Sequence, residues 1–424
     1  MPTVSVLVPN YNHARFLDER LKSIFNQAYQ DFEVIFLDDA SIDNSVEVFR
    51  KYSTRSNVRA ILNERNSGST FRQWNRGVRA AKGRYIWIAE SDDVAEPQFL
   101  NTLVPLLESN SNIGIAYCNS TVIDERGEKQ ETVDRWSAQV DANRWSQDYI
   151  NSGAEECRRY LIWRNTIPNA SAVVFRKSIY EESGYADETM TRCGDWWVWV
   201  QMLLLSDIAY VAAPLNLFRR HMAISHSIIN HNIAMEETLQ VLHEIASRLD
   251  LSPEAEAEMG RAFVYHLGWR QNVANEETVV LPSTILYLAA LTSERLYSAI
   301  LDFVRDHPNW EIDWSPLSSC VLAGFDKLRP SNYRTFCNLS TIVTKLEQQL
   351  SVLNTEHERL RSSRSYRVAN KLNQLRGYFA PNQSPQYNLL LRLASLVRRI
   401  RTGGAAASRM WIAVRSARKR SSAA

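Results

Sequence analysis

The sequence predicts an α/β domain with a mostly parallel sheet at the start of the chain. Short β-branched runs alternate there with segments whose apolar residues recur at helical spacing, such as Phe16, Leu21 and Ile24. Strands separated by helices form βαβ units, whose successive strands run parallel. The strands expected in the first ninety residues are Val4–Val8, Phe32–Leu37, Val58–Leu62 and Tyr85–Ala89, and the helices are expected at 16–28, from about residue 43, and at 70–81.

The chain of 424 residues is long enough for two or three domains. Strands are expected at Ile113–Tyr117 and Ala172–Phe175, and a buried helix at Asp195–Leu205. The composition is then almost wholly helical from Asn232 to about Pro330. We therefore expect a catalytic domain over 1–231, a helical accessory domain over 232–330, and a third region over 331–424.

The third region carries a strongly uneven charge. Residues 331–424 hold 17 Lys and Arg but 3 Asp and Glu, a net charge of +14, whereas the first 330 residues have a net charge of −12. Leu339, Leu346, Leu353 and Leu360 recur every seven residues, which fits either a short coiled coil that could form a homodimer or one amphipathic helix packed on the body.

The N-terminus begins directly with a strand-like run, so we expect no signal peptide. The longest apolar stretches are far shorter than the ~20 residues that span a bilayer. Five cysteines without a CxxC pair favour reduced thiols. These features predict a cytoplasmic protein. The basic tail adds the expectation of peripheral binding to the anionic inner face of the plasma membrane, with a solvated, disordered tail as the alternative.

Polar residues follow each of the first four expected strands. They are Asn10-Tyr11-Asn12, Asp38-Asp39, Asn66-Ser67-Gly68 and Glu90-Ser91-Asp92-Asp93. In open parallel sheets, ligands bind beyond the carboxyl ends of the strands. Any one of these groups alone would more simply be a turn or a helix cap, but four in succession predict one shared site.

The acidic motif Glu90-Ser91-Asp92-Asp93 predicts a metal site. Three carboxylates within four residues repel one another unless a positive charge lies among them, and a buried strand holds them at the edge of the sheet. Mg²⁺ and Mn²⁺ prefer oxygen ligands, and Mg²⁺ usually combines one or two carboxylates with substrate phosphates. The chain has neither a G-x-G-x-x-G sequence after its first strand nor a Walker A motif.

Over roughly residues 3–225 the sequence resembles the inverting family 2 glycosyltransferases of the GT-A fold. The residues that carry this resemblance are Val6 to Asn12, Phe36 to Ser45, Asn66-Ser67-Gly68 with Asn75-Arg76-Gly77, Lys82 to Tyr85, and the acidic motif in the place of the family's DxD. The resemblance implies that Pro9 and Tyr11 line the nucleotide pocket, that Asp39 binds the base, and that Asp92 holds Mn²⁺ or Mg²⁺ beside Asp93. Asp38, Asn66, Gly68 and Glu90 are placed in the same nucleotide-sugar site, although the family usually has Asp where this chain has Glu90.

Asp195 is the residue that the resemblance implies as the catalytic base. Cys193-Gly194-Asp195-Trp196 is similar to the family's Glu-Asp segment, with Gly194 in place of the Glu. Neighbouring tryptophans could raise the pKa of the Asp195 carboxyl towards a useful range and could stack on a sugar. The plainer alternative is that Asp195 only caps a buried helix.

Four further residues are candidates. Arg219-Arg220-His221 is similar to an Arg-x-His element of the family, which makes His221 a candidate metal ligand and either arginine a candidate diphosphate contact. A surface loop explains them equally well. Arg72 is a second candidate phosphate partner.

We expect from these features an inverting, metal-dependent glycosyltransferase that uses a UDP- or dTDP-sugar donor. The expected acceptor is a cell-surface polysaccharide or a lipid-linked oligosaccharide, and no nucleic-acid partner is expected. Ser363-Arg364-Ser365-Tyr366-Arg367 resembles a short element of bacterial surface-polysaccharide enzymes. The alternatives are a nucleotidyltransferase, which would want a glycine-rich phosphate loop, and a non-catalytic sugar-binding or scaffold protein.

Overall fold

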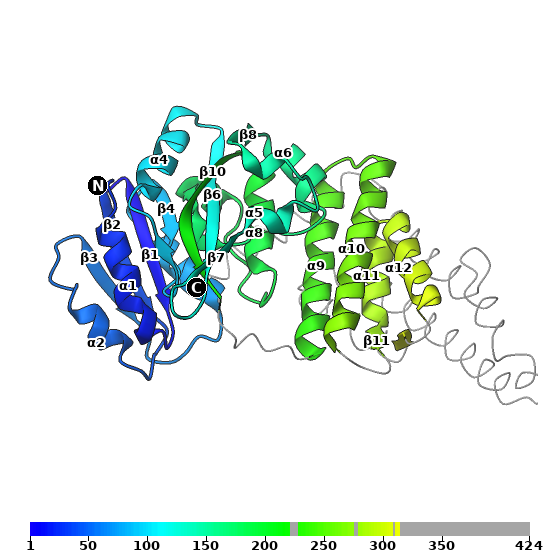
Figure 1. Ribbon diagram of the computed structural model, residues 1–424, viewed down its shortest axis with the longest axis horizontal. Coiled ribbons are helices and arrows are strands. Elements are labelled where there is room, and N and C mark those ends of the chain that lie inside the picture. The colour runs from blue at the N-terminus through cyan, green and yellow to red at the C-terminus, as the bar shows by residue number, and fades with distance from the viewer. Residues whose placement is uncertain (221–227, 275–278, 308–309, 314–424) are drawn as a thin grey trace, which may run out of the picture. The chain divides into compact units, whose positions relative to one another are not determined.

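The computed structural model describes residues 1–220, 228–274, 279–307 and 310–313 (Figure 1). Its backbone forms two compact units, Met1–Leu251 and the residues from Ser252 onward. His221, the leucine heptads and the basic tail lie outside the described residues, so the expectations about them stay untested.

The first four strands and their helices confirm the expected parallel βαβ arrangement. The strands are β1 (Val4–Asn10), β2 (Phe32–Asp38), β3 (Val58–Leu62) and β4 (Tyr85–Ile88), and the helices between them are α1 (Ala14–Phe25), α2 (Ser45–Arg50) and α3 (Thr70–Ala80). β1 pairs in parallel with both β2 and β4, and β2 pairs in parallel with β3. β3 is therefore the outer strand, as Figure 1 shows.

The sheet continues beyond β4 with both antiparallel and parallel pairs. Its order is β3-β2-β1-β4-β9-β6-β10-β5, with β7 added to β6 and β8 to β10. The additional strands are β5 (Val94–Ala95), β6 (Ile113–Ile123), β7 (Lys129–Thr132), β8 (Tyr149–Asn151), β9 (Val173–Arg176) and β10 (Asp207–Arg219). β9 runs antiparallel to both β4 and β6, and it joins the two halves of the sheet.

Helices cover both faces of this sheet. On one face, α1 and α4 (Phe99–Ser109) pack on Val6, Phe36 and Trp87, all fully buried. On the other face, α3 lies so close to the sheet that a Cβ at Gly77 would meet Leu37 Cδ1 at 2.7 Å. The first unit also contains α5 (Asp134–Ser137), α6 (Gly153–Glu156), a π-helical turn (Cys157–Leu161), 3₁₀ turns (Arg144–Ser146 and Ala170–Ala172), α7 (Lys177–Glu182), α8 (Gly194–Leu203) and α9 (Ile228–Arg248).

The second unit is mainly helical. It contains α10 (Pro253–Ala274), α11 (Ser283–Thr292) and α12 (Glu294–Asp306). Two short strands, β11 (Val279–Pro282) and β12 (Trp310–Asp313), form a small parallel pair that the helical composition did not indicate. Within the described part of the chain, no helix combines the length and the apolar character needed to cross a membrane.

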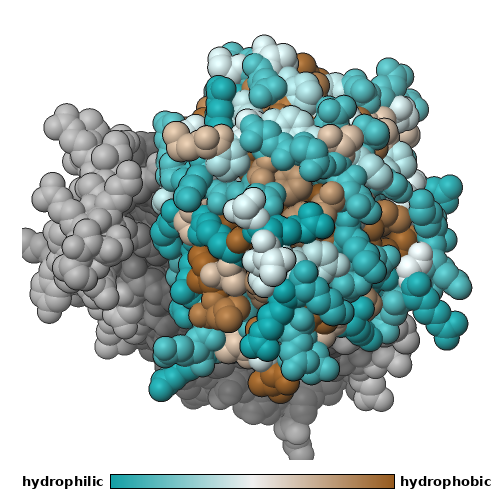
Figure 2. Space-filling model, turned by 90° about the vertical axis from the view of Figure 1, so that its left-hand side faces the viewer, coloured by the Kyte–Doolittle hydropathy of each residue, from teal (hydrophilic) through white to brown (hydrophobic). Residues whose placement is uncertain are grey.

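The face at the β3 edge is mostly hydrophilic, and its hydrophobic residues lie in separate small areas (Figure 2). Scattered exposed hydrophobic side chains such as Ile42 and Leu62 are normal on a protein surface.

Candidate active site

Hydrogen bonds join the polar residues at the ends of the first two strands. Asn10 Nδ2, at the end of β1, donates to Asp38 Oδ1 at the end of β2 over 2.8 Å. Asn12 Oδ1 accepts the backbone N–H of Ile42 at 2.8 Å, and the Asn12 N–H donates to Ser41 Oγ at 3.0 Å. These bonds hold the two strand-end loops together.

Asp39 connects the end of β2 to the loop before α3. Its Oδ1 accepts the Ser67 N–H at 2.9 Å and Gln73 Nε2 at 2.8 Å, and its Oδ2 accepts Ser67 Oγ at 2.8 Å. Asn66 Nδ2 donates to the Asp39 carbonyl at 3.2 Å. Because Oδ2 accepts a single described bond, it still has lone-pair capacity for a nucleotide base, which is the role implied for Asp39.

Two residues at these strand ends hold a left-handed backbone. Asn12 has φ +57° and Ala40 has φ +61°, and both follow the last residues of a strand. Asn adopts this region more readily than Ala, whose Cβ clashes with the backbone there. Local strain of this kind is typical of ligand-binding turns.

The remaining predicted donor-site residues have mixed surroundings. Pro9 is buried within β1, whereas Tyr11, the residue directly after β1, is 45% exposed. Gly68 has φ +72°, a conformation that favours glycine. Arg72 NH1 donates to the Ser67 carbonyl at 3.0 Å, and its Nε lies 3.5 Å from Glu188 Oε2. Arg72 therefore has protein partners and remains only a predicted phosphate contact.

The acidic motif is held from three directions. Trp74 Nε1, from α3, donates to Glu90 Oε1 at 2.8 Å, and His13 Nδ1 is 2.8 Å from Ser91 Oγ. Asp93 Oδ1 accepts the backbone N–H of Arg219 at 2.8 Å. Burial and the charge of Asp92 raise the pKa of Glu90 to about 8, and the same causes raise the pKa of Asp93. The motif is thus short of positive charge, as the sequence suggested.

Arginines supply part of the missing positive charge. Arg20, on α1, is fully buried with its guanidinium 4.8 Å above the Trp87 ring, and its charge opposes the rise in the pKa of Glu90 and Asp93. Arg219 Nε donates to the Asp92 carbonyl at 2.7 Å and its NH2 to Glu19 Oε2 at 2.7 Å. With a side chain only 1% exposed, Arg219 clamps the motif to α1 and β10, which leaves the exposed Arg220 as the more accessible arginine.

The motif fits a cation that is shared with a substrate. Glu90 accepts from Trp74, and Asp93 accepts from the backbone of Arg219, so protein donors already bind these two carboxylates. Asp92 is the carboxylate that the sequence resemblance implies as the metal ligand. Among the described residues, no three His, Cys, Asp or Glu side chains are grouped to hold a metal ion. A Mg²⁺ or Mn²⁺ ion bound by Asp92 and by donor phosphates agrees with this geometry, because such ions often take few protein ligands.

Asp195 lies in the first turn of α8. Its Oδ1 accepts the Trp196 N–H at 2.8 Å, and its Oδ2 accepts Asn165 Nδ2 at 2.9 Å. Burial raises the pKa of Asp195 to about 6, although these hydrogen bonds lower it in part. The helix begins at Gly194 with Cys193 as its N-cap residue, so Asp195 is not the capping residue that the plainer alternative required.

The tryptophans after Asp195 form core rather than an open platform. Trp196 is 4% exposed and Trp199 is fully buried, which corrects the expectation that these rings stack on a sugar. Trp197 alone of the three is half-buried. Packing explains why residue 194 is a glycine, because a Cβ there would lie 2.3 Å from Phe71 Cε2. The Phe71 ring lies against position 194, so a Glu side chain, which the resembled family usually has there, would overlap this ring.

Two chains of contacts link Asp195 to the acidic motif. In α3, Phe71 packs on Gly194 while Trp74, 5.1 Å from the Phe71 ring, donates to Glu90. The second runs through the segment 165–171, whose Asn165 bonds Asp195. At its other end, the buried Ser171 Oγ accepts the Glu90 N–H at 3.1 Å and bonds the Asp93 carboxylate.

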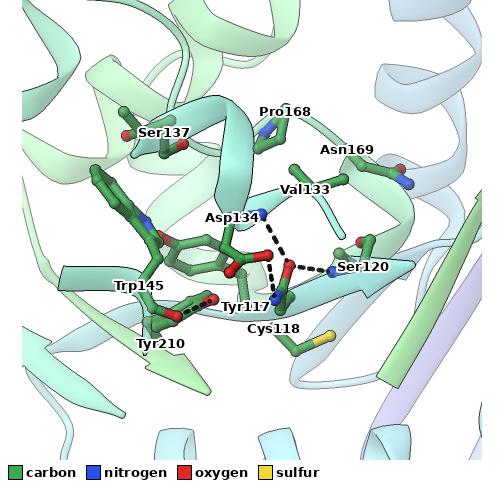
Figure 3. A pocket seen from close by; sticks show the side chains of 13 residues that line it. Tyr117, Cys118, Ser120, Val133, Asp134, Ser137, Trp145, Pro168, Asn169 and Tyr210 are labelled. Carbon is green, nitrogen blue, oxygen red and sulfur yellow. Dashed lines mark hydrogen bonds between the residues drawn. The ribbon is translucent and has the colours of Figure 1, made fainter. Parts of the chain in front are cut away.

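A small cavity lies along this segment. Tyr117, Asp134, Trp145 and Asn169 are among its lining residues (Figure 3). Thr166 Oγ1 and Asn169 Nδ2 are buried there without a hydrogen-bond partner in the described protein. The cavity has room for one water molecule and none for a sugar ring.

Sequence reasoning missed three residues of this site. Asn165 and Ser171 occur in a loop with no motif, and only their contacts show that this loop links Asp195 to the acidic motif. Glu237 lies on α9, 42 positions after Asp195, within a helix that composition assigned to another domain. No local pattern could have identified these residues, because each contact is made over a long sequence separation.

Comparison with known proteins identifies the domain. The profile of Glycosyl transferase family 2 matches residues 5–184. Glycosyltransferase GlyG of Streptococcus pneumoniae is 38% identical over 100 residues, covering 24% of this chain and 33% of that protein. An uncharacterised glycosyltransferase of Haemophilus influenzae is 27% identical over 239 residues, covering 54% and 69%.

A solved structure supports the fold. The structure of Staphylococcus aureus TarS residues 1–349 superposes with a TM-score of 0.50 at 17% identity, covering 72% of this chain and 81% of that one. TarS itself, a poly(ribitol-phosphate) β-N-acetylglucosaminyltransferase, is 29% identical over 112 residues, which cover 26% of this chain and 20% of TarS. The chain thus spans a third of GlyG and a fifth of TarS by sequence. Its first unit has the GT-A fold, and residues 5–184 match the profile of glycosyltransferase family 2.

Proposed function

We propose that this chain transfers a sugar from a nucleotide-diphosphate donor to an acceptor hydroxyl, with inversion at the sugar carbon. The observation that carries the proposal is the two chains of contacts, through α3 and through 165–171, that link Asp195 to the acidic motif. A carboxylate with a raised pKa beside a cluster suited to a diphosphate and its cation is the arrangement that such a transfer needs.

The donor half of the site follows from the strand-end residues. Asp39 is proposed to select a uracil or thymine base, whose imide N–H could donate to Oδ2. Asp92 is proposed to hold Mn²⁺ or Mg²⁺, which when bound would offset the negative charge of the departing diphosphate. Pro9, Tyr11, Asp38, Asn66, Gly68 and Glu90 are proposed to shape this half, and His221 remains a proposed second ligand outside the described residues.

Asp195 is proposed to act as the base. The acceptor oxygen forms a bond to the sugar carbon, the bond from that carbon to the diphosphate oxygen breaks, and Asp195 takes the hydroxyl proton. With a pKa of about 6, the carboxylate is mostly unprotonated at pH 7 and is a stronger base than an ordinary Asp. Asn165 and the Trp196 N–H fix its orientation, which favours a productive approach of the hydroxyl.

The acceptor is proposed to be a cell-surface polysaccharide or a lipid-linked glycan. TarS acts on poly(ribitol-phosphate), as its name states, and the +14 charge of residues 331–424 suits an anionic membrane or polymer. A homodimer through the leucine heptads is part of the same proposal.

A donor screen tests the proposal. The full-length protein would be mixed with UDP-N-acetylglucosamine, UDP-glucose, UDP-galactose, dTDP-rhamnose or GDP-mannose, each with Mn²⁺ or with EDTA. We expect one UDP- or dTDP-sugar to raise the melting temperature and to release its nucleoside diphosphate slowly, in both cases more strongly with Mn²⁺. Absence of stabilisation and of release for every donor, with the protein folded, would contradict the proposed function.

A further inference from the structure

Helix α9 holds the loop that leads into Asp195 through a single carboxylate. Glu237 Oε1 accepts the Thr191 N–H at 2.8 Å and Thr191 Oγ1 at 3.1 Å. Glu237 Oε2 accepts the Arg192 N–H at 2.8 Å and the Cys193 N–H at 2.7 Å. One side chain, only 6% exposed, thus satisfies three consecutive backbone donors directly before α8.

We propose that Glu237 is the positioning residue of the base: its carboxylate fixes the 191–193 loop and the start of α8, and so holds the Asp195 side chain in place. The inference rests on the proposed role of Asp195. It assigns a function in transfer to α9, which lies beyond the family-matched residues 5–184 and after the expected domain boundary at 231.

The geometry favours positioning over a general structural role. The donors that Glu237 binds end at Cys193, two residues before Asp195, and Cys193 Sγ also lies 3.6 Å from both the Ala234 carbonyl and Thr238 Oγ1. One turn of α9 therefore holds the N-terminal end of α8 from the α9 side, while Phe71 packs on Gly194 from α3. Movement of this end would displace the Asp195 carboxylate from the acceptor hydroxyl.

Charge provides a second, separable effect. The groups that interact electrostatically with Asp195 include Glu237 from α9 and Cys193 from its own loop. Burial raises the pKa of Cys193 to about 12, so the thiol is neutral near pH 7 and contributes no charge there. Arg192 is exposed on the same loop, and Asn165 is neutral. The Glu237 charge raises the pKa of Asp195, and its removal should lower that pKa.

The test compares Glu237→Gln with Glu244→Gln in the full-length protein. Glu244 is a matched control, because it lies two turns further along α9, is 4% exposed, and pairs with Arg248 at 3.8 Å. Release of UDP from UDP-N-acetylglucosamine would be measured between pH 4.5 and 8. For Glu237→Gln we expect kcat about 10 to 100-fold lower, an unchanged KM for the donor, and an acidic limb shifted to lower pH by roughly half a unit. Glu244→Gln should keep the kcat and the limb of the unsubstituted protein.

A second variant and a second measurement keep the test decisive if Glu237→Gln folds poorly or if the protein turns this donor over too slowly. Glu237→Asp keeps the charge but is one methylene shorter, so it should lower kcat without moving the acidic limb. Hydrogen–deuterium exchange of the amides at 191–193 needs no donor, and we expect faster exchange in both Glu237 variants than in Glu244→Gln. Unchanged exchange, or an unchanged kcat and pH limb in Glu237→Gln, would overturn the inference. Full activity of Asp195→Asn would instead overturn the proposed function and leave the exchange result as the test of the loop.

Discussion

Gly194 and Asp195 show how packing and chemistry meet in two adjacent residues. The Phe71 ring requires that position 194 has no side chain, because a Cβ there would lie 2.3 Å from the ring. The next residue projects a carboxylate whose pKa burial raises to about 6, and Asn165 and the Trp196 N–H hold it in place. The glycine that departs from the family's sequence is thus explained by its neighbour on α3.

The pH dependence of transfer follows from the raised pKa of Asp195. A base acts only when it is unprotonated, so kcat/KM should fall about tenfold per pH unit below about pH 6 and stay level above it. An unperturbed Asp would place this limb near pH 4. A pH–rate profile of donor consumption by the folded protein measures the pH at which this limb falls. A limb near pH 4 would contradict the claim that burial raises the pKa of Asp195.

Substitution of Gly194 tests the packing. Gly194→Ala should lower the free energy of unfolding by about 1–3 kcal/mol, because the added methyl overlaps the Phe71 ring. Chemical denaturation measures this change. Phe71→Leu in the same chain should recover part of the loss, since it vacates the contested space. A neutral Gly194→Ala would show that the ring moves aside freely.

At the scale of elements, the four βαβ strands and the cores of β6 and β9 could be predicted, whereas the short strands of the second half could not. β1, β2 and β4 are buried apolar runs, and β3 is a short, partly exposed run between two helices, so local patterns identify all four. β5, β7 and β8 have two to four residues each and are defined by their partners in the sheet. The acidic motif and Asp195 were found from motifs, whereas Asn165, Ser171 and Glu237 depend on contacts that only the folded chain creates.

Arg219 tests the connection between β10 and the acidic motif. Arg219→Met leaves the Asp92 and Asp124 carbonyls without their guanidinium donors, which should cost about 1–3 kcal/mol of stability and weaken Mn²⁺-dependent donor binding. Arg220→Met is the neighbouring control: it removes an exposed guanidinium 5.3 Å from the Trp136 ring and should change stability by less than about 0.5 kcal/mol. Equal losses of stability in the two variants would contradict the clamp.

At the scale of the whole molecule, the opposite charges of the two parts of the chain suggest a division of work. The body, with a net charge of −12 over 330 residues, contains the proposed chemistry, and residues 331–424 carry +14. Each basic residue near an anionic bilayer contributes about 1 kcal/mol. The GT-A unit itself extends from Met1 to Leu251, so it includes α9 and Glu237 beyond the family-matched segment.

Removal of the tail tests this division. A chain ending at Leu360 should lose most of its co-sedimentation with phosphatidylglycerol vesicles at low salt, because 14 of the 17 basic residues of 331–424 follow that position. Vesicles of phosphatidylcholine are the control. Unchanged sedimentation of the shortened chain would contradict membrane binding by the tail, and it would not bear on the proposed transfer site.

The central claim is that Asp195 is the base of a sugar transfer at the acidic motif. Asp195→Asn keeps the size of the side chain and removes its ability to accept a proton. Product formation and donor affinity would be measured on the same preparation. The account predicts a loss of turnover of about 10² to 10⁴-fold with donor affinity unchanged within about twofold. Retained turnover, or an equal loss of turnover and donor affinity, would contradict it.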